Sequence, residues 1–158
     1  MIGAWVAIGV TAVLGGLLSW VDVREHRLPN RLVAVLTVAV ALSLVAASAQ
    51  TGDWAALLRA LLGGLALAGL YLAVAIISPA SMGMGDVKLA FPLGMLVAWF
   101  SWTAWLWALF GSFVLGGLAA VSLLLLRRTG LKQQLAFGPA MVLAALVMAV
   151  LAATVRFE

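Results

Sequence analysis

The sequence predicts an all-α integral membrane protein with six transmembrane helices, and two observations support this fold class. Of its 158 residues, 66% are hydrophobic and only 9% are charged, whereas a soluble domain carries about 25% charged residues. The apolar residues also form runs of about 20, the length at which an α-helix crosses the hydrocarbon core of a bilayer. No soluble core could hide so much apolar surface, so we expect a single membrane-embedded domain over residues 1–158.

The first half of the chain contains three apolar runs with short polar breaks between them. Each run is long enough for one membrane helix, and their approximate bounds are 2–21, 31–49 and 54–77. The first run is too long for a cleaved signal peptide and lacks the basic N-terminal region of one. A glycine-rich turn over residues 81–86 follows the third run.

The apolar stretch over residues 87–126 contains a single charged residue, Lys88. As one helix it would be about 60 Å long, twice the thickness of the hydrocarbon core. We therefore divide it near residues 100–103 into a fourth helix, short and bent by Pro92, and a fifth. A sixth helix is expected over about 137–155.

Glycine and proline indicate helix packing and helix boundaries. Pairs of glycine are expected to let neighbouring helices approach closely; they occur at 15–16, 63–64 and 116–117. Pro29, Pro79 and Pro139 each fall near a helix boundary, where proline is best tolerated.

The basic residues predict the orientation, because loops rich in lysine and arginine remain in the cytoplasm. Two of the nine basic residues, Arg59 and Arg156, fall on or near one side. The other seven fall on the opposite side: Arg24, Arg27, Arg31, Lys88, Arg127, Arg128 and Lys132. Both termini are therefore expected outside, and the net charge of +4 is attributed to topology rather than to nucleic acid binding. Four tryptophans cluster at the outer turn between the fourth and fifth helices, as in an interfacial aromatic belt: Trp99, Trp102, Trp105 and Trp107.

The composition also limits the chemistry of the site. Cysteine is absent, which excludes disulfides, thiolate metal sites and cysteine nucleophiles. The single histidine, His26, argues against a multi-histidine metal site. We therefore expect neither a metal nor another cofactor.

The chain has five acidic residues, and their positions divide them into two groups. Asp53 in an outer loop and Glu158 at the terminus are expected to be solvated. Asp22, Glu25 and Asp86 lie at the cytoplasmic ends of membrane segments, where an ionisable group is costly and is by default functional. From position alone, an ordinary interfacial cap is an equal alternative.

The residues around Asp86 favour a functional role. Gly83, Met84 and Gly85 precede it and an apolar helix follows. Glycines allow another chain to approach the backbone closely, which suits a carboxylate that meets a peptide. The alternative is a loop that ends in an aspartate N-cap.

Three motifs occur in order along the chain. Asp22 begins a segment that ends in Leu28-Pro29-Asn30, residues 83–86 form Gly-Met-Gly-Asp, and residues 137–139 form Phe-Gly-Pro at the start of the sixth helix. The set resembles the type IV prepilin peptidases, which are membrane aspartyl proteases, in its motifs, their spacing and the helix count. The resemblance implies catalytic roles for Asp22 and Asp86. It implies substrate-binding or site-shaping roles for Pro29, Asn30, Gly83, Gly85, Lys88, Phe137, Gly138 and Pro139.

The resemblance also implies a reaction and a place for it. Such enzymes remove the basic leader peptide from type IV prepilins and pseudopilins at the cytoplasmic face of the prokaryotic inner membrane. The expected partners are therefore the precursor and membrane lipid. Two close carboxyl groups share a proton, and we expect Asp86, at a helix N-terminus, to be the base and Asp22, at a helix C-terminus, the acid.

Not every feature of the family is present. The first helix begins at residue 2 and cysteine is absent, so the cytoplasmic segment that the bifunctional members use for N-methylation is not expected. The short form resembles the peptidases of Flp-type pili and the archaeal preflagellin peptidases. Lys88 would serve equally well as a snorkelling boundary residue.

Three other functions agree in part with the sequence. A small ion-coupled transporter would use the aspartates as carriers, but would also carry polar residues near mid-membrane. A non-catalytic assembly scaffold would need neither aspartate. A signal peptide peptidase would place its aspartates deeper and carry a Pro-Ala-Leu element, which this chain lacks. The sequence does not indicate the particular substrate or the oligomeric state.

Overall fold

The structure is a computed structural model, and it describes residues 2–25, 28–78, 82–125 and 137–157. All regular structure in these residues is helical. The six helices are α1 (Ile2–Glu25), α2 (Asn30–Thr51), α3 (Trp54–Ile77), α4 (Met84–Phe100), α5 (Trp102–Leu125) and α6 (Gly138–Phe157). The expected helices are thus confirmed, including the division of the long apolar stretch, which falls at Ser101.

Five of the helices are long and apolar enough to cross a membrane, and α4 is the exception. With 17 residues, α4 is about 26 Å long, as the sequence suggested when it predicted a short fourth helix. It contacts each of the other five helices, and 13 of its residues are buried. Because the other helices shield α4 from lipid, α4 does not itself need the length and apolar outer surface of a membrane-spanning helix.

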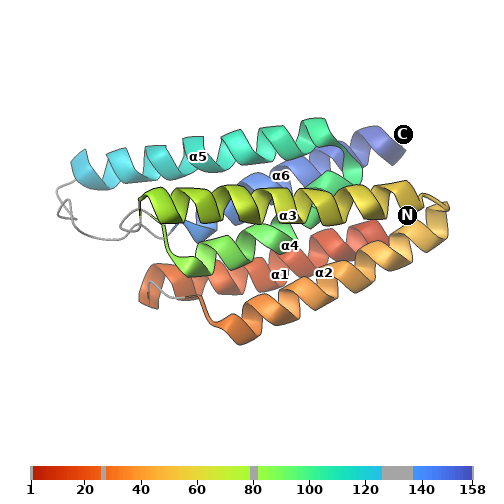
Figure 1. Ribbon diagram of the computed structural model, residues 1–158, viewed down its shortest axis with the longest axis horizontal. Coiled ribbons are helices and arrows are strands. Elements are labelled where there is room, and N and C mark those ends of the chain that lie inside the picture. The colour runs from red at the N-terminus through yellow and green to blue at the C-terminus, as the bar shows by residue number, and fades with distance from the viewer. Residues whose placement is uncertain (1, 26–27, 79–81, 126–136, 158) are drawn as a thin grey trace.

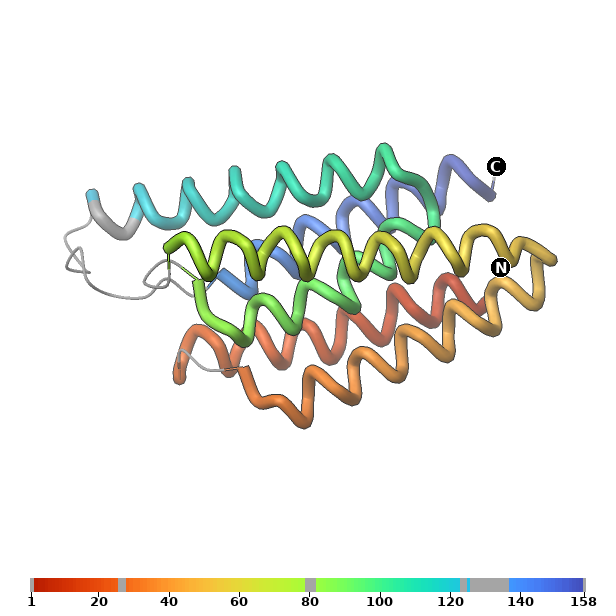
Figure 2. The backbone as a smooth tube through the Cα atoms, in the orientation of Figure 1, coloured from red at the N-terminus to blue at the C-terminus, as the bar shows by residue number. Residues whose placement is uncertain are grey.

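The helices lie side by side along the long axis of the molecule (Figure 1). Both ends of the chain, the turn between α2 and α3 and the junction of α4 with α5 lie at one end. The C-terminal ends of α1, α3 and α5 and the N-terminal ends of α2, α4 and α6 lie at the other, which we call the aspartate end (Figure 2). Arg24, Arg31 and Lys88 belong to the aspartate end. Four further basic residues of the predicted cytoplasmic side lie outside the described residues: Arg27, Arg127, Arg128 and Lys132.

The outer helices expose large apolar side chains over much of their length, among them Val13, Leu42 and Ile76. Exposure of this extent is unfavourable in water but not in hydrocarbon. Within each helix, the interior backbone polar groups are hydrogen-bonded to one another, as a bilayer requires. The structure therefore supports a multi-pass membrane protein.

The most extensive helix contact joins α3 to α4, and glycines let the two helices approach closely. A Cβ atom on Gly94 would lie 2.7 Å from the carbonyl oxygen of Gly63, and one on Gly64 would lie 2.6 Å from Met95 Cγ. This pair of glycines acts as predicted. In the two other pairs only one member faces a neighbour: Gly15 and Gly116 do, whereas Gly16 and Gly117 face open space.

Two arginines bind the C-terminal end of α4. Arg59 Nε of α3 donates to the carbonyl oxygen of Ala98 at 2.7 Å, and Arg156 Nη1 of α6 donates to that of Trp99 at 2.9 Å. The last carbonyls of a helix lack intrahelical partners and carry partial negative charge, so cations there are stabilising. Arg59 and Arg156 therefore hold α4 at this end of the bundle.

Asp53 is partly exposed in the turn between α2 and α3, as expected, but it also has structural partners that the sequence did not indicate. Its carboxylate caps α3 by accepting from the N–H of Ala56 at 2.9 Å, and it forms an ion pair with Arg156. The N–H of Ala56 and the charge of Arg156 hold the pKa of Asp53 below its usual value, against the opposing effect of partial burial. Asp53 thus joins the start of α3 to the end of α6.

The tryptophan cluster has two parts, so the predicted aromatic belt is only partly correct. Trp99 is fully buried and its Nε1 donates to Ser48 Oγ at 2.9 Å, while Trp105 Nε1 donates to the carbonyl oxygen of Gly63 at 3.0 Å. Trp102 and Trp107 are exposed and remain suited to the headgroup region. Two of the four rings therefore serve helix packing.

The contact between α3 and α4 makes Gly94 a sensitive position. Gly94→Ala should lower the free energy of unfolding by about 1–3 kcal/mol, because the new methyl group collides with backbone and Cβ atoms. Thermal unfolding of the purified protein in detergent measures this. Gly69→Ala is the matched control, since its Cβ meets nothing within 4 Å. Equal melting temperatures for the two variants would contradict the close contact.

Candidate active site

Asp22 lies inside the last turn of α1, because the helix continues to Glu25 rather than ending before the aspartate. Only 6% of the residue is exposed. Its Oδ2 accepts a hydrogen bond of 3.1 Å from the backbone N–H of Gly138, the first residue of α6. A residue near the start of the chain is thus held by the last described helix.

Gly138 leaves no space for a side chain. A Cβ atom at this position would lie 2.8 Å from Asp22 Oδ2. Pro139 follows in the first turn of α6, where proline is tolerated because its missing N–H would have no partner within the helix. Gly138 thus allows the backbone to approach the carboxylate closely, and Pro139 is suited to the start of the helix.

Asp86 is equally buried, at 6% exposure. The alternative in which Asp86 is the N-cap of α4 is wrong, because Gly83 is the N-cap and Asp86 is the third helical residue. Asp86 Oδ2 accepts from the N–H of Gly83 at 3.2 Å. Its Oδ1 is buried and has no hydrogen-bond partner among the described residues.

The two aspartates lie at the same end of the bundle. Asp22 is in the last turn of α1 and Asp86 in the first turn of α4, and both are buried there. Each carboxyl group also accepts a backbone N–H at the N-terminus of a helix, α6 for Asp22 and α4 for Asp86. Such ends carry partial positive charge and favour a carboxylate. The fold therefore places two buried carboxyl groups, each with a backbone donor at a helix start, at the same end of the bundle.

The residues before α2 form one wall of this region. A Cβ atom on Gly85 would lie 2.8 Å from Leu28 Cβ, so the start of α4 packs directly on the segment before α2. Pro29 is the N-cap of α2 and its carbonyl accepts from the N–H of Leu32 at 3.0 Å. The Leu-Pro-Asn and Gly-Met-Gly-Asp motifs thus meet in space.

Lys88 and Asn30 make a second contact between the same elements. Lys88 Nζ donates to Asn30 Oδ1 at 2.9 Å, and both side chains are exposed. The bond joins α4 to the first residue of α2. It gives Lys88 a structural role in addition to the two roles weighed from the sequence.

Phe137 approaches the site from its other side, and it leads to residues that the sequence analysis missed. Its ring centroid lies 6.1 Å from that of Tyr71 on α3 and 5.6 Å from that of Phe113 on α5. The Tyr71 hydroxyl and Ser112 Oγ are 2.7 Å apart. Tyr71 is the only tyrosine of the chain, a signal that could have singled it out.

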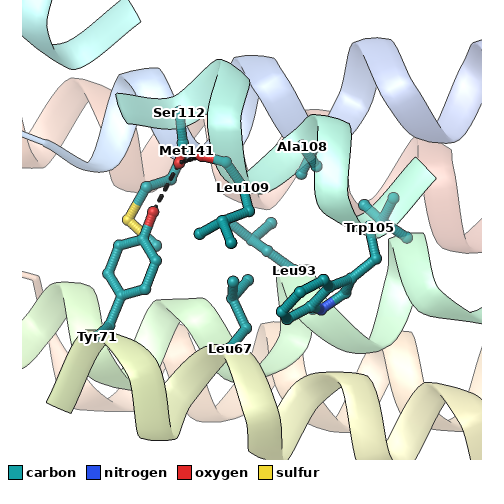
Figure 3. Close-up of a pocket in the computed structure, with 11 residues that line it drawn as sticks. Leu67, Tyr71, Leu93, Trp105, Ala108, Leu109, Ser112 and Met141 are labelled. Carbon is teal, nitrogen blue, oxygen red and sulfur yellow. Dashed lines mark hydrogen bonds between the residues drawn. The ribbon is translucent and has the colours of Figure 1, made fainter. Parts of the chain in front are cut away.

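Tyr71 and Ser112 also line a small internal cavity between α3, α4, α5 and α6 (Figure 3). Its other walls are mostly apolar, including Leu67, Leu93 and Met141. A volume of about 10 Å³ is close to the smallest that holds one water molecule. The cavity is therefore a packing gap, and neither aspartate lines it.

The described residues contain no cluster of three or more histidine, cysteine or acidic side chains that could bind a metal ion. His26 lies outside the described residues. The described side chains at this end of the bundle can therefore support acid–base chemistry.

Comparison with known proteins identifies the family of this chain. A model of the type IV leader peptidase family matches residues 9–121, which include both aspartates. The chain belongs to the type IV leader peptidase family. No curated protein and no solved structure matches the chain significantly.

The family match ends before α6. Phe137, Gly138 and Pro139 therefore join the site on geometric grounds, through the hydrogen bond from Gly138 to Asp22. As a member of a leader peptidase family, the protein is a peptidase, and its substrate is a protein.

The contact of Gly85 with Leu28 makes Gly85 a sensitive position for activity. Gly85→Ala should lower peptidase activity at least about tenfold, because displacement of a catalytic group by about 1 Å can cost a hundredfold in rate. Gly9→Ala on α1 is the matched control and should retain activity within about twofold, since its Cβ would meet nothing within 4 Å. Activity per amount of folded enzyme is the measurement. Equal losses in the two variants would show that the contact with Leu28 does not matter.

Proposed function

We propose that this family member is a membrane aspartyl endopeptidase whose catalytic pair is Asp22 and Asp86. The observation that carries the proposal is the placement of two carboxyl groups, from α1 and α4 and each 6% exposed, at the same end of a bundle of membrane helices. Burial of ionisable groups in such a protein is costly and is retained where it serves function.

The proposed reaction needs only the two carboxyl groups and a water molecule. Two close carboxylates cannot both be charged cheaply, so they share one proton. One accepts a proton from the water as its oxygen attacks the scissile carbonyl, and the other protonates the carbonyl oxygen and then the leaving amine. Asp86 Oδ1 supports this role, because it is a buried acceptor with no partner among the described residues.

Helix ends do not decide which aspartate is the base. The sequence suggested Asp86, because it alone was expected at a helix N-terminus. Asp22 accepts the N–H of Gly138 at the start of α6, so both carboxyl groups are close to such an end. The proposal is therefore limited to a pair that shares a proton, with pKa values that belong to the pair.

The substrate class we propose is type IV prepilins and pseudopilin-like precursors. Such a precursor has a basic leader in the cytoplasm and an apolar helix in the membrane, so its scissile bond lies at the cytoplasmic interface. The aspartates lie at the end of the bundle that also carries Arg24, Arg31 and Lys88, and basic loops remain in the cytoplasm. We accordingly propose the prokaryotic cytoplasmic membrane as the location.

Asp22→Asn and Asp86→Asn should each lower cleavage of a co-expressed prepilin by at least about a hundredfold, because each removes one acid–base group. Cleavage is measured as a mobility shift of the precursor, at equal amounts of enzyme in the membrane. Glu25→Gln is the control, since Glu25 is exposed and lies one turn from Asp22. Unimpaired cleavage by either aspartate variant would remove that residue from the mechanism.

The proposed orientation can be measured with single cysteines, since the chain has none of its own. Thr51→Cys and Arg31→Cys place a thiol at opposite ends of α2, both at exposed positions. A membrane-impermeant maleimide applied to intact cells should label Thr51→Cys only, and both variants after permeabilisation. Labelling of Arg31→Cys alone in intact cells would reverse the orientation and move the site to the outer face.

A further inference from the structure

Phe137 occupies a recess on α5 that is made by a glycine. A Cβ atom on Gly116 would overlap the Cδ2 and Cε2 atoms of the Phe137 ring. The ring also packs against Phe113 and Tyr71, with centroids 5.6 and 6.1 Å away. We call Tyr71, Phe113 and Phe137 the aromatic cluster. It joins the start of α6 to the C-terminal third of α3 and the middle of α5.

Hydrogen bonds hold the tyrosine of this cluster in place. Tyr71 is 1% exposed. Ser112 Oγ donates to the carbonyl oxygen of Leu109 at 2.7 Å, so its single proton is used and the Tyr71 hydroxyl donates to Ser112 Oγ (Figure 3). A buried hydroxyl without a partner is costly. The bond therefore fixes the face of Tyr71 that Phe137 contacts.

The position of Phe137 bears directly on Asp22. The N–H that binds Asp22 Oδ2 belongs to the planar peptide unit between Phe137 and Gly138. The carbonyl oxygen of Phe137 accepts from the N–H of Met141 at 3.2 Å, which fixes this residue to the first turn of α6. The Phe137 ring and the N–H that holds the carboxylate are therefore connected through a single residue.

We propose that the aromatic cluster, seated against Gly116, is a positioning device for Asp22: it holds the N–H of Gly138 at the carboxylate and so sets the geometry of the catalytic pair. Tyr71, Phe113, Gly116 and Phe137 are then positioning residues for the reaction. The inference rests on the proposed function, because it assigns the cluster to the site that contains Asp22 and Asp86.

Adjacent glycines on α5 provide the test. Gly116→Ala collides with the Phe137 ring, whereas Gly117→Ala meets nothing within 4 Å and has the same change in composition. In purified full-length enzyme acting on the prepilin, Gly116→Ala should lower kcat about 10- to 100-fold with KM within about twofold, since a small displacement of a catalytic group costs rate rather than binding. Gly117→Ala should keep both constants.

A second variant covers the case in which Gly116→Ala folds poorly. Phe137→Leu introduces no collision but removes the ring from its recess, and it should also lower kcat with little change in KM. The double variant should be no slower than Phe137→Leu alone, because the two substitutions act through one contact. Melting temperatures of all variants are measured in parallel.

Three results would overturn the inference. The first is an unchanged kcat in folded Gly116→Ala and Phe137→Leu. The second is an increase in KM at unchanged kcat, which would make Phe137 a substrate contact. The third is a loss of rate that only follows the loss of folded enzyme. Asp22→Asn separates the two proposals. If it retains activity, the proposed function fails; if it is inactive while the cluster variants keep the wild-type kcat, only the positioning role fails.

Discussion

A carboxylate buried among helices in lipid must find hydrogen-bond donors within the protein, and much of this fold follows from that requirement. The two aspartates obtain theirs from backbone N–H groups of Gly138 and Gly83, at the starts of α6 and α4. Only helix N-termini offer such donors without an intrahelical partner. The aspartates therefore depend on three helices, α1, α4 and α6, whose ends must meet at one level of the bundle.

Contacts at both ends of α4 fix its position along the membrane normal. At one end Gly85 packs against Leu28, and at the other Arg59 and Arg156 bind its last carbonyls. Between them, the glycine contacts with α3 bring the two backbones together without a layer of side chains. A short, buried helix has few apolar contacts with lipid to fix its position along the membrane normal. The polar contacts at its ends do so instead, and with it they position Asp86.

The fold could be predicted from the sequence because its signals are local. Apolar runs of bilayer length and short polar breaks define the six helices, and three ordered motifs indicate the pair of aspartates. The contacts that complete the site could not be predicted, because they join residues far apart in the chain. Asp22 and Gly138 are 116 positions apart, and the recess at Gly116 depends on which face of α5 turns inward. The same limit explains Asp53 and Trp99: in the sequence each is an interfacial residue, and only the packed bundle supplies their partners Arg156 and Ser48.

The hydrogen bond from Gly138 to Asp22 has a consequence for biosynthesis. A nascent chain that has inserted only α1 to α5 already carries both aspartates, but not the N–H that orients one of them. Formation of the site therefore waits for α6 to dock between α1 and α5, the helices with which it makes its most extensive contacts. Under the proposed function, the order of synthesis thus leaves the catalytic pair incomplete until the last described helix has entered the membrane.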